Sequence, residues 1–334
     1  MNGQGELFVK GKYPAPYMYM HNQSKKNTPA LWSRDELAAQ AQVALDEFVA
    51  RRLAEPGGLY LSHVKARRKS IFQLFKALAD IELHGMTIGA ARSILLDDEL
   101  SDALRYLSGP PVSEDDLGVL VTRSIGGISK GAIKRSESLA LDILSLVRKL
   151  ADPSRFPWIG QNRRPSFGEI RTAVRSTTAL QASQSLQTER RGYGKVVERR
   201  LENRLVELGF ARTPAPHRAL INDPIDYPTY PNFYGECTVH GRKVDLFIAL
   251  PTGRMIALEA KDSSSALNSV KRLNNDTAAK AKHFAVEGGK NIINVALLSG
   301  VFKPEHLIRA QEAGLHIVWA HSVDDFIDWV KSQV

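Results

Sequence analysis

The sequence contains one cysteine, Cys237, and this scarcity excludes two kinds of structure. A single cysteine cannot form an internal disulfide, and it cannot build a cysteine-rich zinc site. Because such a chain suits a reducing compartment, we expect a cytoplasmic location. The sequence also lacks an apolar run near the roughly 20 residues that span a bilayer, and residues 1–28 contain no apolar segment of the secretory kind. We therefore expect no membrane partner and no export signal.

Acidic residues are missing from two stretches, residues 56–79 and 117–136, and both stretches are basic. The formal net charge of the whole chain is +9. Basic stretches attract the phosphates of nucleic acids, although a solvated basic face can serve solubility alone. The first stretch holds the cations that we expect to contact DNA, with solubility as the alternative: Lys65, Arg67, Arg68 and Lys69.

Two motifs of nucleotide chemistry are absent or incomplete. No GxxxxGK[ST] phosphate-binding loop occurs, so the chain shows no ATP-driven activity of its own. His63-Val64-Lys65 has the His-x-Lys form of phospholipase D-type nucleases, but Ser70 stands where an aspartate is needed, and the surrounding pattern is helical. We discount that mechanism.

The length of 334 residues exceeds that of most single compact domains and predicts two structural units. We expect a flexible N-terminal segment over residues 1–30 and an α-helical domain over residues 31–165. Proline, glycine and tryptophan concentrate near the end of that domain and mark the connection. A mixed α/β domain with a bridging helix then occupies residues 166–334.

Apolar spacing and capping residues locate helices in the first half. Ile71, Leu74, Phe75 and Leu78 follow the spacing of one helical face. After Pro110-Pro111, Ser113 predicts the start of a further helix.

The second half alternates between helix and strand signals. Ser166 and Glu169 form a capping-box pattern that opens the bridging helix. A separate helix of about four turns is expected to end at Gly209, where the chain needs a left-handed cap. The prolines of residues 214–231 predict an extended surface loop. Two apolar runs around a turn at residues 251–254 predict a β-hairpin, followed by a helix over about 265–286, two more strands and two more helices. The expected class is α/β (α+β): a mixed β-sheet core flanked by helices and preceded by a helical domain.

The hairpin carries the residues whose side chains can take part in catalysis. Asp245 lies near the start of its first strand, and Glu259 and Lys261 lie near the end of its second strand. Because these ends face each other in a hairpin, the two carboxylates can converge, and strand alternation puts Glu259 and Lys261 on one face with Ala260 turned into the core. Carboxylate oxygens suit Mg²⁺, so Asp245 and Glu259 are the expected metal ligands, and Lys261 can orient or deprotonate an attacking water. A surface ion pair is the plainer alternative.

An upstream helix adds Glu198 and Glu202, one turn apart. In the PD-(D/E)xK nuclease superfamily, which the pattern Asp245, Glu259 and Lys261 resembles, a helical glutamate in this place often supports a metal, so the resemblance implies that Glu198 joins the catalytic set. The alternative is that either glutamate only pairs with Lys195 or Arg199.

The segment from about residue 110 to the C-terminus resembles the XamI-type type II restriction endonucleases, a family of the PD-(D/E)xK nuclease superfamily. The matching stretches are residues 111–117 (PVSEDDL), 188–191 (TERR) with Gly194-Lys195, 267–274 (LNSVKRLN) and 298–302 (LSGVF). The resemblance implies a restriction-endonuclease-like fold and cleavage of double-stranded DNA at a short specific sequence. It also implies Mg²⁺, for which Mn²⁺ can substitute, and the catalytic set Asp245, Glu259 and Lys261. Val244 replaces the proline of the superfamily's name.

Further expectations follow from this resemblance. Residues just after the catalytic strand are expected to contact DNA, with a solvated helix start as the alternative: Asn268, Ser269, Lys271 and Arg272. We expect a homodimer on a palindromic site and a cognate DNA methyltransferase in the same system. A repair or recombination nuclease, or a DNA-binding protein with a degenerate site, remains the alternative.

Overall fold

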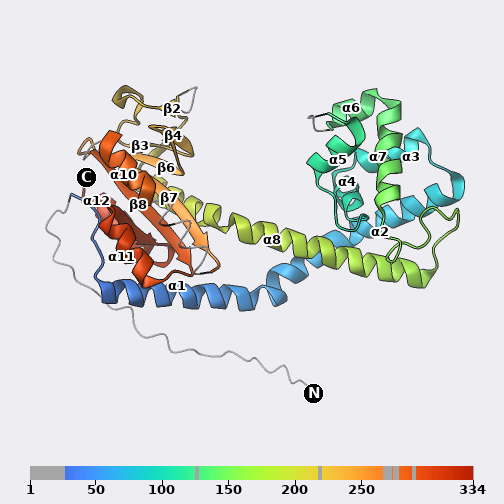
Figure 1. Cartoon of the computed structure of the whole chain (residues 1–334), viewed down its shortest axis with the longest axis horizontal. Helices are drawn as coiled ribbons and strands as arrows, with labels where there is room; N and C mark the ends of the chain where they lie inside the picture. The colour runs from blue at the N-terminus through green and yellow to red at the C-terminus, as the bar shows by residue number, and fades with distance from the viewer. Residues whose placement is uncertain are drawn as a thin grey trace, which may run out of the picture.

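The computed structural model describes residues 27–124, 128–216, 220–265, 273, 278–287 and 291–333 (Figure 1). Its first half is helical, and its second half contains mixed β-sheets flanked by helices. This arrangement confirms the expected fold class. In the described residues, no helix is both long enough and apolar enough to cross a membrane.

The helical elements before the sheets include three that exceed twenty residues. In chain order they are α1 (Arg34–Ala54), η1 (Pro56–Tyr60), α2 (Leu61–His84), α3 (Ile88–Leu95), α4 (Asp98–Arg105), α5 (Glu114–Thr122), α6 (Lys130–Arg135), α7 (Glu137–Leu150) and α8 (Phe167–Glu207).

The second half alternates strands with short helices. Its elements are β1 (Ala211–Thr213), β2 (Leu220–Ile221), η2 (Pro224–Asp226), β3 (Asn232–Tyr234), β4 (Cys237–Val239), β5 (Arg242–Val244), β6 (Leu246–Ala249), β7 (Met255–Ser263), α10 (Ala278–Glu287), β8 (Ile292–Gly300), α11 (Pro304–Glu312), β9 (Leu315–Trp319), η5 (Ala320–Ser322) and α12 (Val323–Lys331).

Serine caps fix where two of the predicted helices begin. The Ser113 hydroxyl accepts a hydrogen bond from the Asp116 amide at 3.0 Å and opens α5. Ser166 and Glu169 form the complete capping box that opens α8. Both predicted starts are confirmed.

The helix α8 corrects one prediction. It runs without interruption through 41 residues, so the bridging helix and the expected separate four-turn helix are one element. The predicted left-handed cap is confirmed, because Gly209 has a φ of +90° directly after this helix. The predicted loop of residues 214–231 is partly structured, since it contains β2 and η2.

A six-stranded mixed sheet has the order β1-β3-β6-β7-β8-β9. The expected hairpin is confirmed by the antiparallel pairing of β6 with β7. The strands β7, β8 and β9 are parallel, and α10 lies on the connection from β7 to β8, because parallel neighbours need a crossover. A second sheet has the order β2-β4-β5. Between β5 and β6 the chain passes from the smaller sheet into the larger one, at Asp245.

Helices cover both faces of the large sheet. On one face, Leu201 and Leu205 of α8 and Phe326 of α12 pack against Ile256 and Leu258 of β7. The opposite face is covered by residues of α1, α10 and α11. The central strands are thereby held rigidly between two apolar layers.

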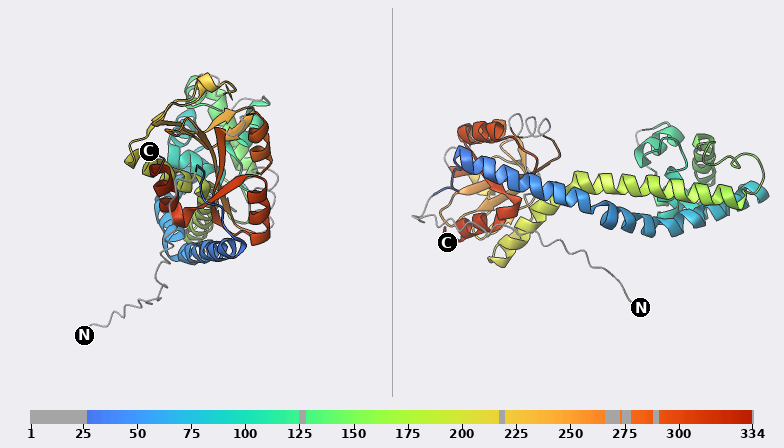
Figure 2. Two further views of the ribbon diagram at one scale, coloured as in Figure 1. Left: turned by 90° about the vertical axis from the view of Figure 1, so that its left-hand side faces the viewer. Right: turned by 90° about the horizontal axis from the view of Figure 1, so that it is seen from below.

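The helical half has an apolar core of its own. The predicted face Ile71, Leu74, Phe75 and Leu78 is fully buried in it, together with residues of α3, α4 and α7. Figure 1 shows this core at one end of the molecule and the sheet at the other, joined by α8 and by the run α1–η1–α2. The two connections lie side by side in Figure 2 as well.

The first long helix belongs with the sheet by its packing. Leu37, Ala41 and Ala44 of α1 are buried against Ala296 and Leu298 of β8 and against α11. The division at residues 30 and 165 stays a prediction, but α1 contributes to the core of the second unit although it precedes the first.

A polar waist, which we define as residues 45–69 and 187–196, separates the two cores. In residues 45–69, Glu55 is the one buried residue, and residues 187–196 contain none. Glu55 accepts hydrogen bonds from Arg52 at 2.6 Å and from Arg190 of α8 at 3.0 Å. Burial raises the pKa of Glu55, but the bonds from Arg190 and Arg52 outweigh burial and hold this pKa below its ordinary value. The waist therefore depends on charge pairing where the cores depend on apolar contact.

Replacing Glu55 tests the contribution of these ion pairs to stability. Glu55→Gln is expected to lower the free energy of unfolding by about 1–3 kcal/mol, since two arginines lose their charged partner in a buried place. Glu189→Gln is the matched control, because Glu189 also pairs across the waist, with His63 at 3.0 Å, but is 47% exposed. Because the folded pKa of Glu55 is lowered, its contribution is present above its ordinary pKa of 4.5 and is lost as the pH falls. Urea unfolding at several pH values should show a difference between wild type and Glu55→Gln that shrinks in acid.

Gly300 closes the long parallel strand β8 in a conformation that other residues rarely adopt, with a φ of +90°. A Cβ atom there would lie 2.1 Å from the carbonyl oxygen of Ser263 in β7. That carbonyl accepts a hydrogen bond from the Val301 amide at 2.8 Å. The ends of β7 and β8 approach so closely that only glycine fits.

Gly300→Ala is therefore expected to be strongly destabilising. Gly253→Ala is its control, because Gly253 has a φ of +77° but no heavy atom within 4 Å of the added Cβ. The backbone conformation alone should cost about 1–2 kcal/mol in either variant, and Gly300→Ala should lose clearly more. Equal losses in chemical denaturation would show that the approach to Ser263 is unimportant.

Candidate active site

The hairpin brings Asp245 beside the end of β7. The Asp245 amide donates to the Leu258 carbonyl at 3.0 Å, and the Ala260 amide donates to Oδ2 of Asp245 at 2.8 Å. Ala260 itself is buried in the core beneath the sheet, as strand alternation predicts. Asp245 is thus attached to the strand between Glu259 and Lys261, and the predicted convergence of these three residues is observed.

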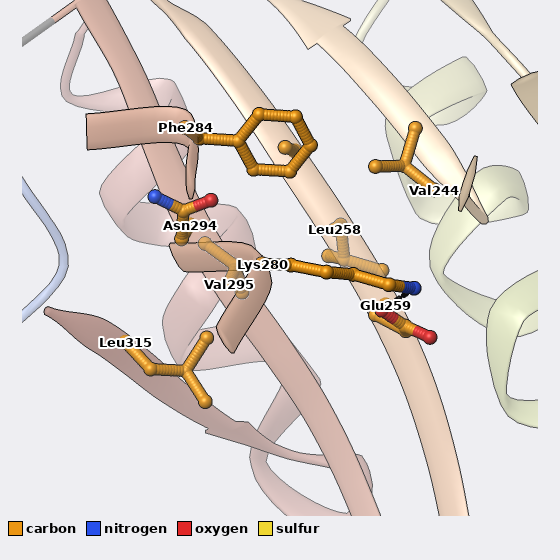
Figure 3. A pocket seen from close by; sticks show the side chains of 9 residues that line it. Val244, Leu258, Glu259, Lys280, Phe284, Asn294, Val295 and Leu315 are labelled. Atoms are coloured by element: carbon orange, nitrogen blue, oxygen red, sulfur yellow. Dashed lines mark hydrogen bonds and ion pairs between the residues drawn. The ribbon is translucent and has the colours of Figure 1, made fainter. Parts of the chain in front are cut away.

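Glu259 is 8% exposed, and each of its oxygens has a lysine partner. Lys261 pairs with Oε1, and Lys280 of α10 donates to Oε2 at 2.6 Å. Figure 3 shows Lys280 reaching across to Glu259 above the sheet. Lys280 also donates to the Lys243 carbonyl at 2.8 Å, so it links Glu259 to the strand that leads into Asp245.

The cavity beside Glu259 has a volume of about 10 Å³, and its lining combines the polar side chains of Lys280 and Asn294 with apolar ones such as Phe284 and Leu258 (Figure 3). Such a volume holds about one water molecule. A small organic substrate cannot enter there.

Lys195 of α8 gathers three carboxylates on the other side of Asp245. Its Nζ lies 2.8 Å from Glu198, 3.3 Å from Glu236 and 3.5 Å from Asp245. Burial opposes the charge of Lys195, but these carboxylates outweigh it and raise the pKa of Lys195. At Gly194, just before Lys195, α8 runs close to β7: a Cβ atom there would make an ordinary contact of 3.8 Å with the Ala260 carbonyl oxygen.

Glu198 is 5% exposed and points to this cluster. Burial raises the pKa of Glu198, the hydrogen bond from Lys195 opposes this rise, and the charge of Asp245 adds to it. Glu202, one turn later, lies 3.7 Å from Arg212. Of the two glutamates, Glu198 is the one that shares a lysine with Asp245, and its predicted pairing with Lys195 is also present.

The donor set fits a hard divalent cation. Asp245 and Glu259 offer carboxylate oxygens on adjoining strands, which is the ligand chemistry that Mg²⁺ prefers. Across the described ranges, no group of three or more His, Cys, Asp or Glu residues is arranged to hold a metal ion. A cation at this place would therefore depend on two protein carboxylates and on oxygens from water or substrate, as Mg²⁺ commonly does.

The sequence-predicted DNA contacts lie elsewhere or outside the described residues. Lys65, Arg68 and Lys69 are exposed on α2, and Arg67 of the same helix lies 3.7 Å from Asp102. None of the four is part of the hairpin cluster. The predicted contacts at Asn268, Ser269, Lys271 and Arg272 fall outside the described residues. His63 of the discounted His-x-Lys motif is helical and pairs with Glu189.

Glu236 and Lys280 were not expected at the site from the sequence, and Lys195 was expected only as an ion-pair partner of Glu198 or Glu202. Lys195 stands one turn before Glu198, and this spacing was a usable signal. Glu236 and Lys280 carried no such signal, because both reach the cluster only through tertiary packing.

Comparison with known proteins supplies independent evidence on the family. Residues 86–319, which include the whole hairpin, match the family described as XamI restriction endonuclease. The chain is 34% identical over 272 residues to "Type II restriction enzyme XamI" of Xanthomonas campestris pv. amaranthicola, and the match covers 79% of this chain and 94% of that protein.

A solved structure, protein VC1899 from Vibrio cholerae, aligns with a TM-score of 0.25 at 13% identity. It covers 80% of this chain and 57% of that one, and a similarity this low carries no argument about fold or function. The family match and the match to the Xanthomonas protein carry more weight, because each extends over most of this chain. On their strength, this chain belongs to the XamI restriction endonuclease family.

Proposed function

We propose that this protein is a type II restriction endonuclease that hydrolyses phosphodiester bonds of double-stranded DNA at a short specific sequence. The observation that carries the proposal is the hydrogen bond that fixes Asp245 to β7 between Glu259 and Lys261. The relative from Xanthomonas campestris is named as a type II restriction enzyme, which supports the same activity.

Mg²⁺ is the proposed cofactor, and Mn²⁺ can replace it. Restriction enzymes generally use Mg²⁺, and Asp245 and Glu259 are the residues that would hold it. When bound, the ion supplies a Lewis acid that stabilises negative charge on the phosphate. Lys261 and Lys280 neutralise the charge of Glu259.

The catalytic set that we propose is Asp245, Glu259, Lys261 and Glu198. Lys261 lies beside Glu259, where its ammonium can orient an attacking water by donating a hydrogen bond from Nζ, and its neutral amine can accept a proton from that water. Glu198 and Lys195 keep Asp245 in place from α8. The buried strands beneath these groups limit their movement, which favours a preorganised site.

Several finer features belong to the same proposal. DNA contacts are proposed for Lys65, Arg67, Arg68 and Lys69 on α2, and for Asn268, Ser269, Lys271 and Arg272. A homodimer would supply two hydrolytic centres for the two strands of a palindrome. A cognate DNA methyltransferase would protect the host DNA, and a cytoplasmic location suits a chain with one cysteine.

Substitution of the catalytic set is the direct test. Asp245→Ala, Glu259→Ala and Lys261→Ala should each lower cleavage on the order of 100-fold or more, because each removes a group that acts in the transition state. Glu312→Ala and Lys331→Ala are charge-matched controls, since both residues are exposed, on α11 and α12. The measurement is single-turnover cleavage of a plasmid, followed by sequencing of the ends.

Cleavage at the wild-type rate by any of the three purified variants would remove that residue from the set. Ends without a common sequence would favour a repair or recombination nuclease instead. Tight DNA binding without any cleavage in Mg²⁺ would favour the degenerate binding protein.

Metal exchange is a separate test. Cleavage should require Mg²⁺ or Mn²⁺, and Ca²⁺ should support DNA binding without hydrolysis because its looser coordination activates water poorly. Plasmid digestion in each metal, paired with a gel-shift measurement in Ca²⁺, checks both statements. Undiminished digestion in excess EDTA would contradict a role for metal.

A further inference from the structure

An open pocket of about 360 Å³ lies next to the proposed active site and has no role in the mechanism above. Its lining residues are Arg212, Thr213, Pro214, Ala215, Gly235 and Glu236. They come from β1 with the residues after it, and from the turn between β3 and β4.

The topology places this pocket where two parallel strands end. β1 and β3 are parallel, and their last residues, Thr213 and Tyr234, are paired. The residues that follow each strand therefore leave the sheet at the same edge. Ligands commonly bind outside the carboxyl ends of parallel strands, because the chains diverge there. The pocket volume lies within the range of about 300–1,000 Å³ that ligand sites usually have.

Arg212 supplies the principal charge. Its side chain is 58% exposed, and its nearest carboxylate, Glu202, lies 3.7 Å away. The guanidinium lies directly against Gly235: a Cβ atom built there would be 2.2 Å from one of its nitrogens. A glycine at this position therefore gives the guanidinium its place on the pocket wall.

A single side chain, that of Lys195, links the pocket to Asp245. Glu236 accepts from Lys243 at 2.6 Å and from Lys195 at 3.3 Å, and Lys195 lies 3.5 Å from Asp245. The single charge of Glu236 is shared by two lysines, so it does not cancel Arg212. Of the two charged residues that line the pocket, Glu236 is therefore already engaged by lysines, and Arg212 is the one that faces an incoming anion.

We propose that this pocket binds a backbone phosphate of the cleaved DNA strand, one that neighbours the scissile phosphodiester, through the guanidinium of Arg212. The planar fork of arginine matches two phosphate oxygens, and the hydroxyl of Thr213 is a second donor of the kind that contacts DNA backbones. The space beyond these groups accommodates the attached sugar, beside Pro214 and Ala215. The proposal rests on the proposed function, because it assigns the position of the DNA strand relative to Asp245.

The first arm of the experiment measures binding of a duplex that carries the cleaved sequence, over a series of KCl concentrations in EDTA. Loss of one phosphate contact should reduce the slope of log affinity against log salt by about 0.9 in Arg212→Met. Arg309→Met is the matched control. Arg309 is exposed on α11 beside β9, at the opposite edge of the sheet from β1, and its variant should keep the wild-type slope.

The second arm replaces single phosphates near the scissile position by uncharged methylphosphonates. One replacement should weaken binding by wild type and by Arg309→Met, and should have no further effect on Arg212→Met. Gly235→Ala, which retains the arginine but fills the space it lies against, should weaken binding in the same direction. If a free nucleotide were the true ligand, every methylphosphonate in the duplex would change binding equally in wild type and in Arg212→Met.

An unchanged salt slope in Arg212→Met, or equal losses from every methylphosphonate in wild type and Arg212→Met, would overturn the proposal. Plasmid cleavage by the wild type is measured in parallel. If wild type does not cut DNA, the proposed function fails. If wild type cuts DNA but Arg212→Met responds to every methylphosphonate as wild type does, only the phosphate site is refuted.

Discussion

The hydrogen bond from the Ala260 amide to Asp245 is the constraint on which the proposed site depends. Asp245 lies between β5 and β6, where the chain leaves the small sheet for the large one, so it belongs to neither strand. The backbone of β7 holds it instead, and the next two side chains along that strand's outer face are Glu259 and Lys261. A main-chain donor cannot rotate away, because β7 is paired with β8 along its whole length, Ala260 included, and Ala260 is buried in the apolar core. The positions of all three groups therefore follow from one strand.

Electrostatic balance explains why so much charge can gather there. Carboxylates that share a small, half-buried volume repel each other unless cations lie between them. Lys195, Lys261 and Lys280 come from α8, β7 and α10, and each contacts at least one carboxylate of the cluster. The protein thereby carries its own counter-ions. A divalent cation and a DNA phosphate would redistribute these contacts without having to create the cluster.

The two cores are joined through polar contacts that reach the catalytic strand. Arg51 of α1 donates to Asp262, the residue after Lys261, at 3.0 Å. Its guanidinium also lies 3.3 Å from the ring centroid of Tyr193, on α8. Residues of the waist from both connections thus contact each other and the end of β7. A polar junction of this kind has less to hold it than the apolar cores on either side, since charged pairs near solvent contribute little.

Local signals in the sequence determined the helix starts at Ser113 and Ser166, the cap at Gly209 and the hairpin, because each depends on residues close together in the chain. The hairpin alone was sufficient to bring Asp245 to Glu259 and Lys261. The sequence did not reveal that α8 is one uninterrupted helix, because two helical faces serve two different cores along its length. Nor did it reveal that α1 packs on the sheet, that Lys280 and Glu236 reach the cluster, or that Arg212 lies against Gly235. Those contacts join residues far apart in the chain, and only the burial of apolar surface by the whole fold decides which distant segments meet.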